Sequence, residues 1–267
     1  MDIMELKKQP HLSASGIKDY CECSLKYRFS RVDKLKPEGT SDALELGSCI
    51  HKALADFHQE RMIGNKLSIQ ELHQVFQDHL EAEGKNDIRY KKGNNFDQLL
   101  QDGKNLLTTY YDNLPDDNFK VLAIEEPFTF NIPDLSIPII GIFDLIEEDS
   151  SGTIVIVEFK TSSKSYSSAD IDQSQQLTLY QMGLKQRGYR DREILLRFDC
   201  LIKTKVPKFE QYYSTRSEID EKKLAKKIGQ IWNAIEKGVF IPNESFKCGG
   251  CSYKTACNEW FLQTGTD

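Results

Sequence analysis

The sequence predicts an α/β fold whose core runs in the order helix, three strands, helix, strand. Three observations predict this order. Apolar residues recur at helical spacing over 46–61. Three strand-like apolar runs follow between 119 and 161. A helical stretch over 168–188 then leads into another apolar run at 193–204. Mostly helical material is expected before and after this core.

Along the chain, helices are expected before, between and after the strands. Ser13 is a suitable N-cap for a helix that continues to about Phe29, and Gly188 is a suitable end for the helix that begins near 168. The remaining predicted helices are 46–61, 68–82, 95–113 and 217–238. A polar loop is expected near 84–95, and the helical pattern breaks at 115–118.

The expected strands include a hairpin. Its turn is Asp149-Ser150-Ser151-Gly152. Centring this turn between its two serines brings Asp144 to within one residue of the position opposite Glu158. The expected strands are 119–130, 135–148, 152–161, 193–204 and 209–215.

Length and composition indicate one globular domain. The 267 residues are 39% hydrophobic and 28% charged. We expect one domain over 1–267, with a core at 46–204, a helical insertion at about 64–118, and chain ends at 11–30 and 240–262 that bind a cofactor. No apolar run approaches 18 residues and no secretory signal is visible, so a cytoplasmic location without membrane contact is expected. In that reducing compartment, the seven cysteines favour metal or redox chemistry over disulfides.

Charge is distributed unevenly along the chain. The formal net charge of −6 argues weakly against a protein coated in nucleic acid. Residues 201–238, however, carry nine Lys or Arg against five acidic residues. This stretch is either a surface that contacts a nucleic-acid backbone or the solvated face of a helix.

Three charged residues interrupt the apolar strands of the hairpin. Asp144 would oppose Glu158, and Lys160 would share a strand face with Glu158. Two such close carboxylates repel each other, and a divalent cation with oxygen ligands, Mg²⁺ or Mn²⁺, would remove the conflict. The alternative is an edge hairpin whose charged side faces water.

Four spaced motifs resemble the PD-(D/E)XK nuclease superfamily, and most closely its RecB-type branch. They are Gly47-x-x-x-His51, Gly141-x-x-Asp144, Glu158-x-Lys160 and Gln176-x-x-x-Tyr180. The resemblance implies a restriction-endonuclease-like αβββαβ core. It also implies a metal bound by His51, Asp144, Glu158 and a backbone carbonyl near Phe159. Lys160 would then activate water or stabilise the transition state, while Gln176 and Tyr180 would position Lys160 and the DNA backbone.

That resemblance implies a metal-dependent DNA exonuclease that acts on single-stranded or frayed ends. The alternative is an inactive nuclease-fold DNA-binding or adaptor subunit of a repair or CRISPR complex, which the presence of Asp144, Glu158 and Lys160 disfavours. The chain contains no GxxxxGK[ST] phosphate loop. Any unwinding would therefore come from a partner, such as a helicase or a CRISPR adaptation protein.

The cysteines suggest a second cofactor. Cys248-x2-Cys251-x5-Cys257 lacks a fourth ligand nearby, and Cys21 or Cys23 could supply it. On one helix these two would point to opposite sides, so one site should use only one of them. Irregularly spaced cysteines from both chain ends favour a [4Fe–4S] cluster, with a structural zinc site as the alternative.

The resemblance selects Cys23 for this cluster. Some RecB-type nucleases, including the AddB nuclease domain and the CRISPR-associated RecB-like exonucleases, carry one N-terminal cysteine before a basic and an aromatic residue, plus a C-terminal triplet. Cys23, followed by Lys26-Tyr27, matches this context and Cys21 does not. The implied ligands are Cys23, Cys248, Cys251 and Cys257. Cys49 and Cys200 are expected to be core residues.

Overall fold

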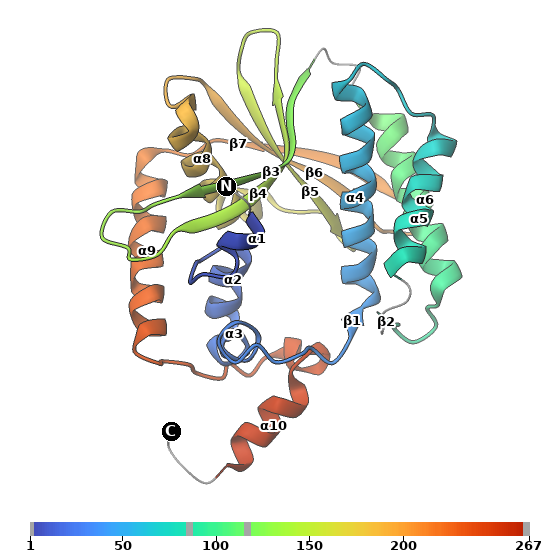
Figure 1. Ribbon diagram of the computed structural model, residues 1–267. Helices are drawn as coiled ribbons and strands as arrows, with labels where there is room; N and C mark the ends of the chain where they lie inside the picture. Colours follow the sequence, from blue (N-terminus) through green and yellow to red (C-terminus); the bar gives the residue numbers. More distant parts are fainter. Residues whose placement is uncertain (1–2, 84–87, 115–118, 264–267) are drawn as a thin grey trace.

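A five-stranded mixed sheet forms the centre of the computed structural model, which describes residues 3–83, 88–114 and 119–263 (Figure 1). Its order is β3 (Lys120–Phe130), β4 (Ile139–Glu148), β5 (Ile154–Ser162), β6 (Ile194–Ile202) and β7 (Lys208–Ser214). Neighbouring strands are antiparallel except β5 and β6, which are parallel because a helical crossover joins them. The predicted α/β class and its order of core elements are confirmed.

Three helices cover one face of the sheet. They are α4 (Asp42–Met62), α5 (Ile69–Glu83) and α6 (Phe96–Asn113). Strand residues Val155, Val157 and Phe159 pack on this side with the apolar residues of the three helices. Because side chains alternate along a strand, the intervening Ile154 and Ile156 point to the opposite face, and so do Glu158 and Lys160.

The second face is covered by helices from the N-terminal, middle and C-terminal parts of the chain. They are α2 (Ala14–Glu22), α7 (Ser168–Asp172), α8 (Gln175–Leu184) and α9 (Glu218–Glu236). Shorter elements complete the fold. These are α1 (Ile3–Leu6), α3 (Ser24–Tyr27), the π turns Arg28–Val32 and Lys185–Tyr189, the paired strands β1 (Thr40–Ser41) and β2 (Ile88–Arg89), the 3₁₀ turn Phe246–Gly250, and α10 (Lys254–Leu262).

The N-terminal segment is hydrogen-bonded to the beginning of β4. The ladder between β4 and β5 covers only Leu145–Glu148 of β4, so the earlier part of β4 has no β5 partner. There the Leu12 amide donates to the Pro138 carbonyl (3.1 Å), and the Leu12 carbonyl accepts from the Ile140 amide (2.9 Å). This bridge fixes the N-terminal segment against the strand that carries Asp144.

Two predicted helices are each broken in two. The predicted helix from Ser13 to Phe29 stops at Cys23, whose backbone is extended (φ −162°, ψ 103°). The reason is a competing set of hydrogen bonds: Ser24 Oγ accepts from the Ile241 amide (2.6 Å), and the Leu25 amide donates to the Ile241 carbonyl (3.3 Å). The prediction of one continuous helix is therefore wrong.

The predicted helix over 168–188 breaks between α7 and α8. Arg216 donates to the carbonyls of Ile171 (2.6 Å) and Ser174 (3.3 Å), and these bonds stabilise the interruption. Gly188 has φ 99° and lies within the π turn that follows α8. The predicted break at 115–118 and part of the loop near 84–95 lie outside the described residues. No helix in the described ranges is long and apolar enough to cross a membrane.

Candidate active site

The candidate active site lies where β4 and β5 separate. Their ladder ends at the pair Leu145–Val157, so Asp144 is the next residue on β4 and faces Glu158 on β5. The Phe159 amide donates a hydrogen bond to Asp144 Oδ2 at 2.9 Å, which holds this carboxylate beside β5. A turn centred between Ser150 and Ser151 would have paired Asp144 with Val157, so the observed register differs from it by one residue, which is within the one-residue margin of the prediction.

A closed ring of hydrogen bonds joins four predicted residues. Lys160 Nζ donates to Glu158 Oε1 (2.6 Å) and to Gln176 Oε1 (2.9 Å). Gln176 Nε2 donates to the Tyr180 hydroxyl (3.0 Å), which donates to Glu158 Oε2 (2.7 Å). The spacing of four residues places Gln176 and Tyr180 on one face of α8, turned toward the charged face of β5. This arrangement, called the catalytic ring after the role predicted for its residues, fixes both oxygens of Glu158 and the ammonium of Lys160.

His51 approaches the carboxylates from α4, a different element. Its Nδ1 lies 3.4 Å from Asp144 Oδ2, and its ring meets the Phe159 ring edge to face at 5.9 Å. The Phe159 backbone also hydrogen-bonds to His51. The structure therefore brings together all seven residues to which the resemblance assigned a catalytic or metal-binding role.

Burial decides the charge state of this group. Burial, and then the Glu158 carboxylate, raises the pKa of Asp144 well above its ordinary value. Burial also acts to raise the pKa of Glu158, but Lys160 and His51 outweigh it, so this pKa is lowered. Burial lowers the pKa of His51. Glu158 therefore favours the ionised form, paired with Lys160, while Asp144 holds a proton more readily than an ordinary aspartate.

A pocket of about 880 Å³ opens onto these residues. His51, Asp144, Phe159 and Lys160 are among the side chains that line it. A phosphodiester that entered this pocket would therefore meet the polar groups from α4, β4 and β5 together.

Glu125 is a further acidic residue in this pocket, and sequence reasoning missed it. It lies on β3 between the pairs Ile124–Leu145 and Glu126–Phe143, and so faces Asp144 from the strand opposite Glu158. Its φ of 46° is unusual for a residue other than glycine. Three adjacent strands thus each contribute one carboxylate at the same level. The sequence signal for this residue was the pair Glu125-Glu126 within an apolar strand. The alternation of side chains along a strand could not show which of the two glutamates faces the pocket.

The donor set fits a divalent cation. Among the described residues, no three or more His, Cys, Asp or Glu side chains already stand in positions that could hold a metal ion. The chemistry is nonetheless that of a hard cation site, because the Asp144 and Glu125 carboxylates and the His51 imidazole line one pocket and Glu158 faces Asp144. The raised pKa of Asp144 marks a position where added positive charge would relieve repulsion between the carboxylates.

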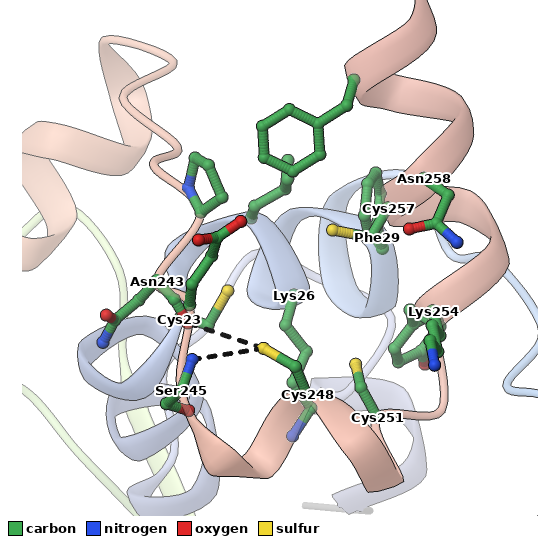
Figure 2. Close-up of a pocket in the computed structure, with 15 residues that line it drawn as sticks. Cys23, Lys26, Phe29, Asn243, Ser245, Cys248, Cys251, Lys254, Cys257 and Asn258 are labelled. Carbon is green, nitrogen blue, oxygen red and sulfur yellow. Dashed lines mark hydrogen bonds between the residues drawn. The ribbon is translucent and has the colours of Figure 1, made fainter.

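The four cysteines of the predicted cluster line one pocket of about 260 Å³ (Figure 2). Cys23 comes from the start of the chain, and Cys248, Cys251 and Cys257 come from its end. The Ser245 amide donates to Cys248 Sγ at 3.4 Å. Burial, and then the neighbouring thiols of Cys23, Cys251 and Cys248, raises the pKa of Cys257. Such mutual repulsion between thiolates is relieved by a bound metal, so these four donors fit a thiolate-ligated group.

The remaining cysteines lie elsewhere. Cys21 is exposed and does not line the pocket. The reasoning that separated Cys21 from Cys23 assumed one helix, whereas the chain is extended at Cys23. Cys49 and Cys200 are fully buried in the two cores, and burial raises the pKa of each thiol to about 12.

Two exposed lysine pairs of the basic stretch lie away from the catalytic ring. Lys222, Lys223, Lys226 and Lys227 are on the outer side of α9, and none of them lines either pocket that borders the ring. Their position matches the solvated helix face that was the alternative interpretation.

Comparison with known proteins identifies the family of this chain. Residues 11–258 match the family model of the PD-(D/E)XK nuclease superfamily. A search of curated proteins finds no match. The crystal structure of a "Putative exonuclease" from Eubacterium rectale is similar in fold, with a TM-score of 0.55 and 13% identity over 99% of this chain and 92% of that one. A second structure, SSO0001, is 14% identical over 96% of each chain, but the TM-score of 0.35 is too low to indicate a shared fold. Since the family match covers nearly the whole chain, and the fold agrees with it, the chain belongs to the PD-(D/E)XK nuclease superfamily.

Proposed function

We propose that the protein is a metal-dependent DNA exonuclease of the RecB type that hydrolyses phosphodiester bonds. The observation that carries the proposal is the catalytic ring, in which a buried ionised carboxylate holds a lysine ammonium at the edge of the pocket that Asp144 and His51 line. An inactive adaptor would have no need to keep this ring intact beside Asp144 and His51. Membership of a nuclease superfamily and the fold shared with an exonuclease-like structure also support the proposal.

Each residue has a role that its contacts suggest. Asp144, Glu158 and His51, with the Phe159 carbonyl, would hold Mg²⁺ or Mn²⁺. When bound, such an ion lowers the pKa of a water molecule and offsets charge on the phosphate. Lys160, fixed between Glu158 and Gln176, directs its positive charge toward the attacking water or a phosphate oxygen. Tyr180 holds the second oxygen of Glu158 and so keeps the lysine in register.

Activity on labelled DNA tests this proposal. Linear single strands and duplexes, each labelled at one end, and a circular single strand are incubated with Mg²⁺ or Mn²⁺. We expect the linear strands to shorten and the circle to resist, because an exonuclease needs an end. Duplex DNA should be degraded only from ends that are frayed or opened by a helicase partner.

Two variants connect the activity to the site. Asp144→Asn and Lys160→Ala should each slow cleavage by roughly 100-fold or more, as the loss of a charge-stabilising group does. Asp112→Asn, an exposed position on α6, is the control and should cleave like the wild type. Equal rates for Asp144→Asn and Asp112→Asn would refute the mechanism. DNA binding without any cleavage by the wild type would favour the adaptor function.

We propose, in addition, that Cys23, Cys248, Cys251 and Cys257 hold a structural [4Fe–4S] cluster. The protein already joins its two ends at this place: Asn243 Nδ2 donates to the Glu22 carbonyl (2.8 Å), and Lys247 pairs with Glu22 (2.7 Å). A cluster would cross-link the ends across more than 220 residues of chain, where loop closure has its largest effect.

Metal and sulfide analysis of anaerobically purified protein tests the cluster. Cys23→Ser should lose visible absorbance, iron and stability, whereas the matched control Cys21→Ser should keep all three. About four irons with equal sulfide indicate the cluster, and one zinc without sulfide indicates a zinc site instead. Loss of metal from Cys21→Ser but not from Cys23→Ser would show that the ligand assignment is wrong.

A further inference from the structure

A second pocket borders the catalytic ring at Gln176 and Tyr180. It has a volume of about 450 Å³, and its lining includes Gln176 and Tyr180 of the ring and Ile140–Ile142 of β4. Ile142 also lines the larger active-site pocket, so the two pockets meet at this residue. A chain-like ligand that lies in the active site can therefore continue into the second pocket without leaving the surface.

The lining of this second pocket is basic. Lys7, His11 and Arg31 contribute to it, together with the hydroxyl residues Ser13 and Ser15, and its lining contains no Asp or Glu. The larger pocket, in contrast, is lined by acidic and basic side chains alike: Asp56, Glu125, Asp144, Lys18, Lys52 and Lys160. The second pocket therefore carries positive charge although the chain as a whole has a net charge of −6. Its chemistry favours an anion with several oxygen acceptors.

The basic groups are held in place relative to the catalytic strand. The Leu12 amide and the Leu12 carbonyl are both hydrogen-bonded at the beginning of β4, and the residue is 1% exposed. These contacts anchor the neighbouring His11 and Ser13. Arg31 donates to Ser15 Oγ (3.0 Å) and lies 3.7 Å from Asp19. A guanidinium has five N–H donors, so these contacts orient it and leave donors for a ligand.

We infer that this pocket binds the nucleic-acid backbone at a phosphate next to the scissile one, with Lys7 and Arg31 as its main contacts. The inference rests on the proposed nuclease function, since it names how that same site holds its strand. Phosphates are the usual partners of Lys, Arg and hydroxyl side chains in such complexes, and they position the strand without reading sequence. Ile142 lines both pockets, so a strand that crosses this residue presents successive phosphates to the two pockets.

Salt-dependent binding separates this role from a general surface charge. Binding of a single-stranded oligonucleotide is measured with a chelator present, so that no cleavage occurs, over a range of salt concentrations. Each lost phosphate contact reduces the slope of log K against log salt by ~0.7 for a single strand. Lys7→Ala and Arg31→Gln should each reduce the slope by about that amount, and the double variant by roughly twice as much.

Lys8→Ala is the matched control for Lys7→Ala. Lys8 is the next residue, pairs with Glu5, and does not line the pocket, so its slope should equal that of the wild type. Because Arg31→Gln also loses contacts to Ser15 and Asp19, its unfolding midpoint is measured too. If Arg31→Gln is unstable, the salt slope of Lys7→Ala decides, because Lys7 is exposed and its replacement should not affect folding. An unchanged slope for Lys7→Ala would overturn the inference.

A neutral methylphosphonate placed at single positions along the strand locates the contact. In the wild type and in Lys8→Ala, a methylphosphonate at one position beside the cleaved linkage should weaken binding. In the double variant Lys7→Ala/Arg31→Gln, the same methylphosphonate should have no effect. If the methylphosphonate weakens binding equally in the wild type and in the double variant, the inference is overturned even if the wild type cleaves DNA. Failure of the wild type to cleave any substrate with added metal would instead refute the proposed function.

Discussion

Tyr180→Phe removes one bond of the catalytic ring and leaves its packing in place. Tyr180 is 3% exposed, and its hydroxyl donates to Glu158 Oε2 at 2.7 Å. Burial, followed by the Glu158 and Asp144 carboxylates, raises the pKa of Tyr180 well above its usual value, so the hydroxyl keeps its proton. The variant therefore deletes a hydrogen bond to a buried, ionised carboxylate.

The size of the effect follows from that burial. A hydrogen bond to a charged group contributes about 1.5–3 kcal/mol to stability, and Gln176 Nε2 also loses its acceptor. We expect the free energy of unfolding to fall by about 2 kcal/mol, which corresponds to a decrease in Tm of roughly 4–8 °C for a chain of this size. If the alignment of Lys160 is lost to the same extent in the transition state, cleavage slows by about 30-fold.

Urea denaturation and cleavage assays measure the two effects, and Tyr212→Phe is the control for stability. Its hydroxyl also donates to a carboxylate, Glu210 Oε2 at 2.6 Å, but that pair is partly exposed. Water can replace the lost partner there, so we expect a cost of about 0.5–1 kcal/mol or less. If Tyr180→Phe costs no more than Tyr212→Phe, the catalytic ring does not hold a buried ionised carboxylate, and the argument from burial fails.

Two further predictions concern charges that flank the site. Glu125→Gln should raise the Mg²⁺ concentration needed for half-maximal cleavage by roughly 10-fold, whereas Glu126→Gln, which loses only a surface pair with Arg187, should not change it. Equal metal titrations would exclude Glu125 from the site. Burial, then Arg61 and Arg197, lowers the pKa of His58 well below its usual value. The unfolded chain therefore takes up a proton near pH 6.5 that the folded chain excludes, and stability falls by up to ~1.4 kcal/mol per pH unit below about pH 6.5. Urea midpoints from pH 7.5 to 5.5 should show this slope reduced in His58→Gln, and an unchanged slope would contradict it.

The hairpin could be predicted because local chemistry determines it. Asp149 Oδ1 accepts from the amides of Ser151 and Thr153, and Gly152 adopts φ 87°, a conformation that glycine accommodates readily. The turn alone brings Asp144 to within one residue of the position opposite Glu158, but it does not fix the exact register, on which the face of each side chain depends. The spacing of Gln176 and Tyr180 likewise determines that they share one helix face.

Features that depend on distant parts of the chain could not be predicted. The break at Cys23 arises because Ile241, more than 200 residues away, hydrogen-bonds to Ser24 and Leu25. Glu125 turns into the active site through a positive φ in a strand, and alternation alone does not indicate this. The basic pocket was also missed, because Lys7, His11 and Arg31 are scattered in sequence and come together only when Leu12 docks on β4.

The N-terminal segment connects the cysteine pocket, the proposed cluster site, to the basic pocket, the proposed phosphate site. Between Leu12 and Arg31 it pairs with β4, supplies Arg31 to the basic pocket and supplies Cys23 to the cysteine pocket. Leu25 and Phe29 of the same segment pack on Tyr253 beside the cysteines. A metal bound by Cys23 and the C-terminal cysteines would therefore restrain the backbone that orients Arg31. The catalytic ring lies on β5 and α8 and contains no residue of this segment. Loss of the cluster should accordingly weaken strand binding more than it slows the chemical step, which would give the cluster a role in substrate affinity without any transfer of electrons.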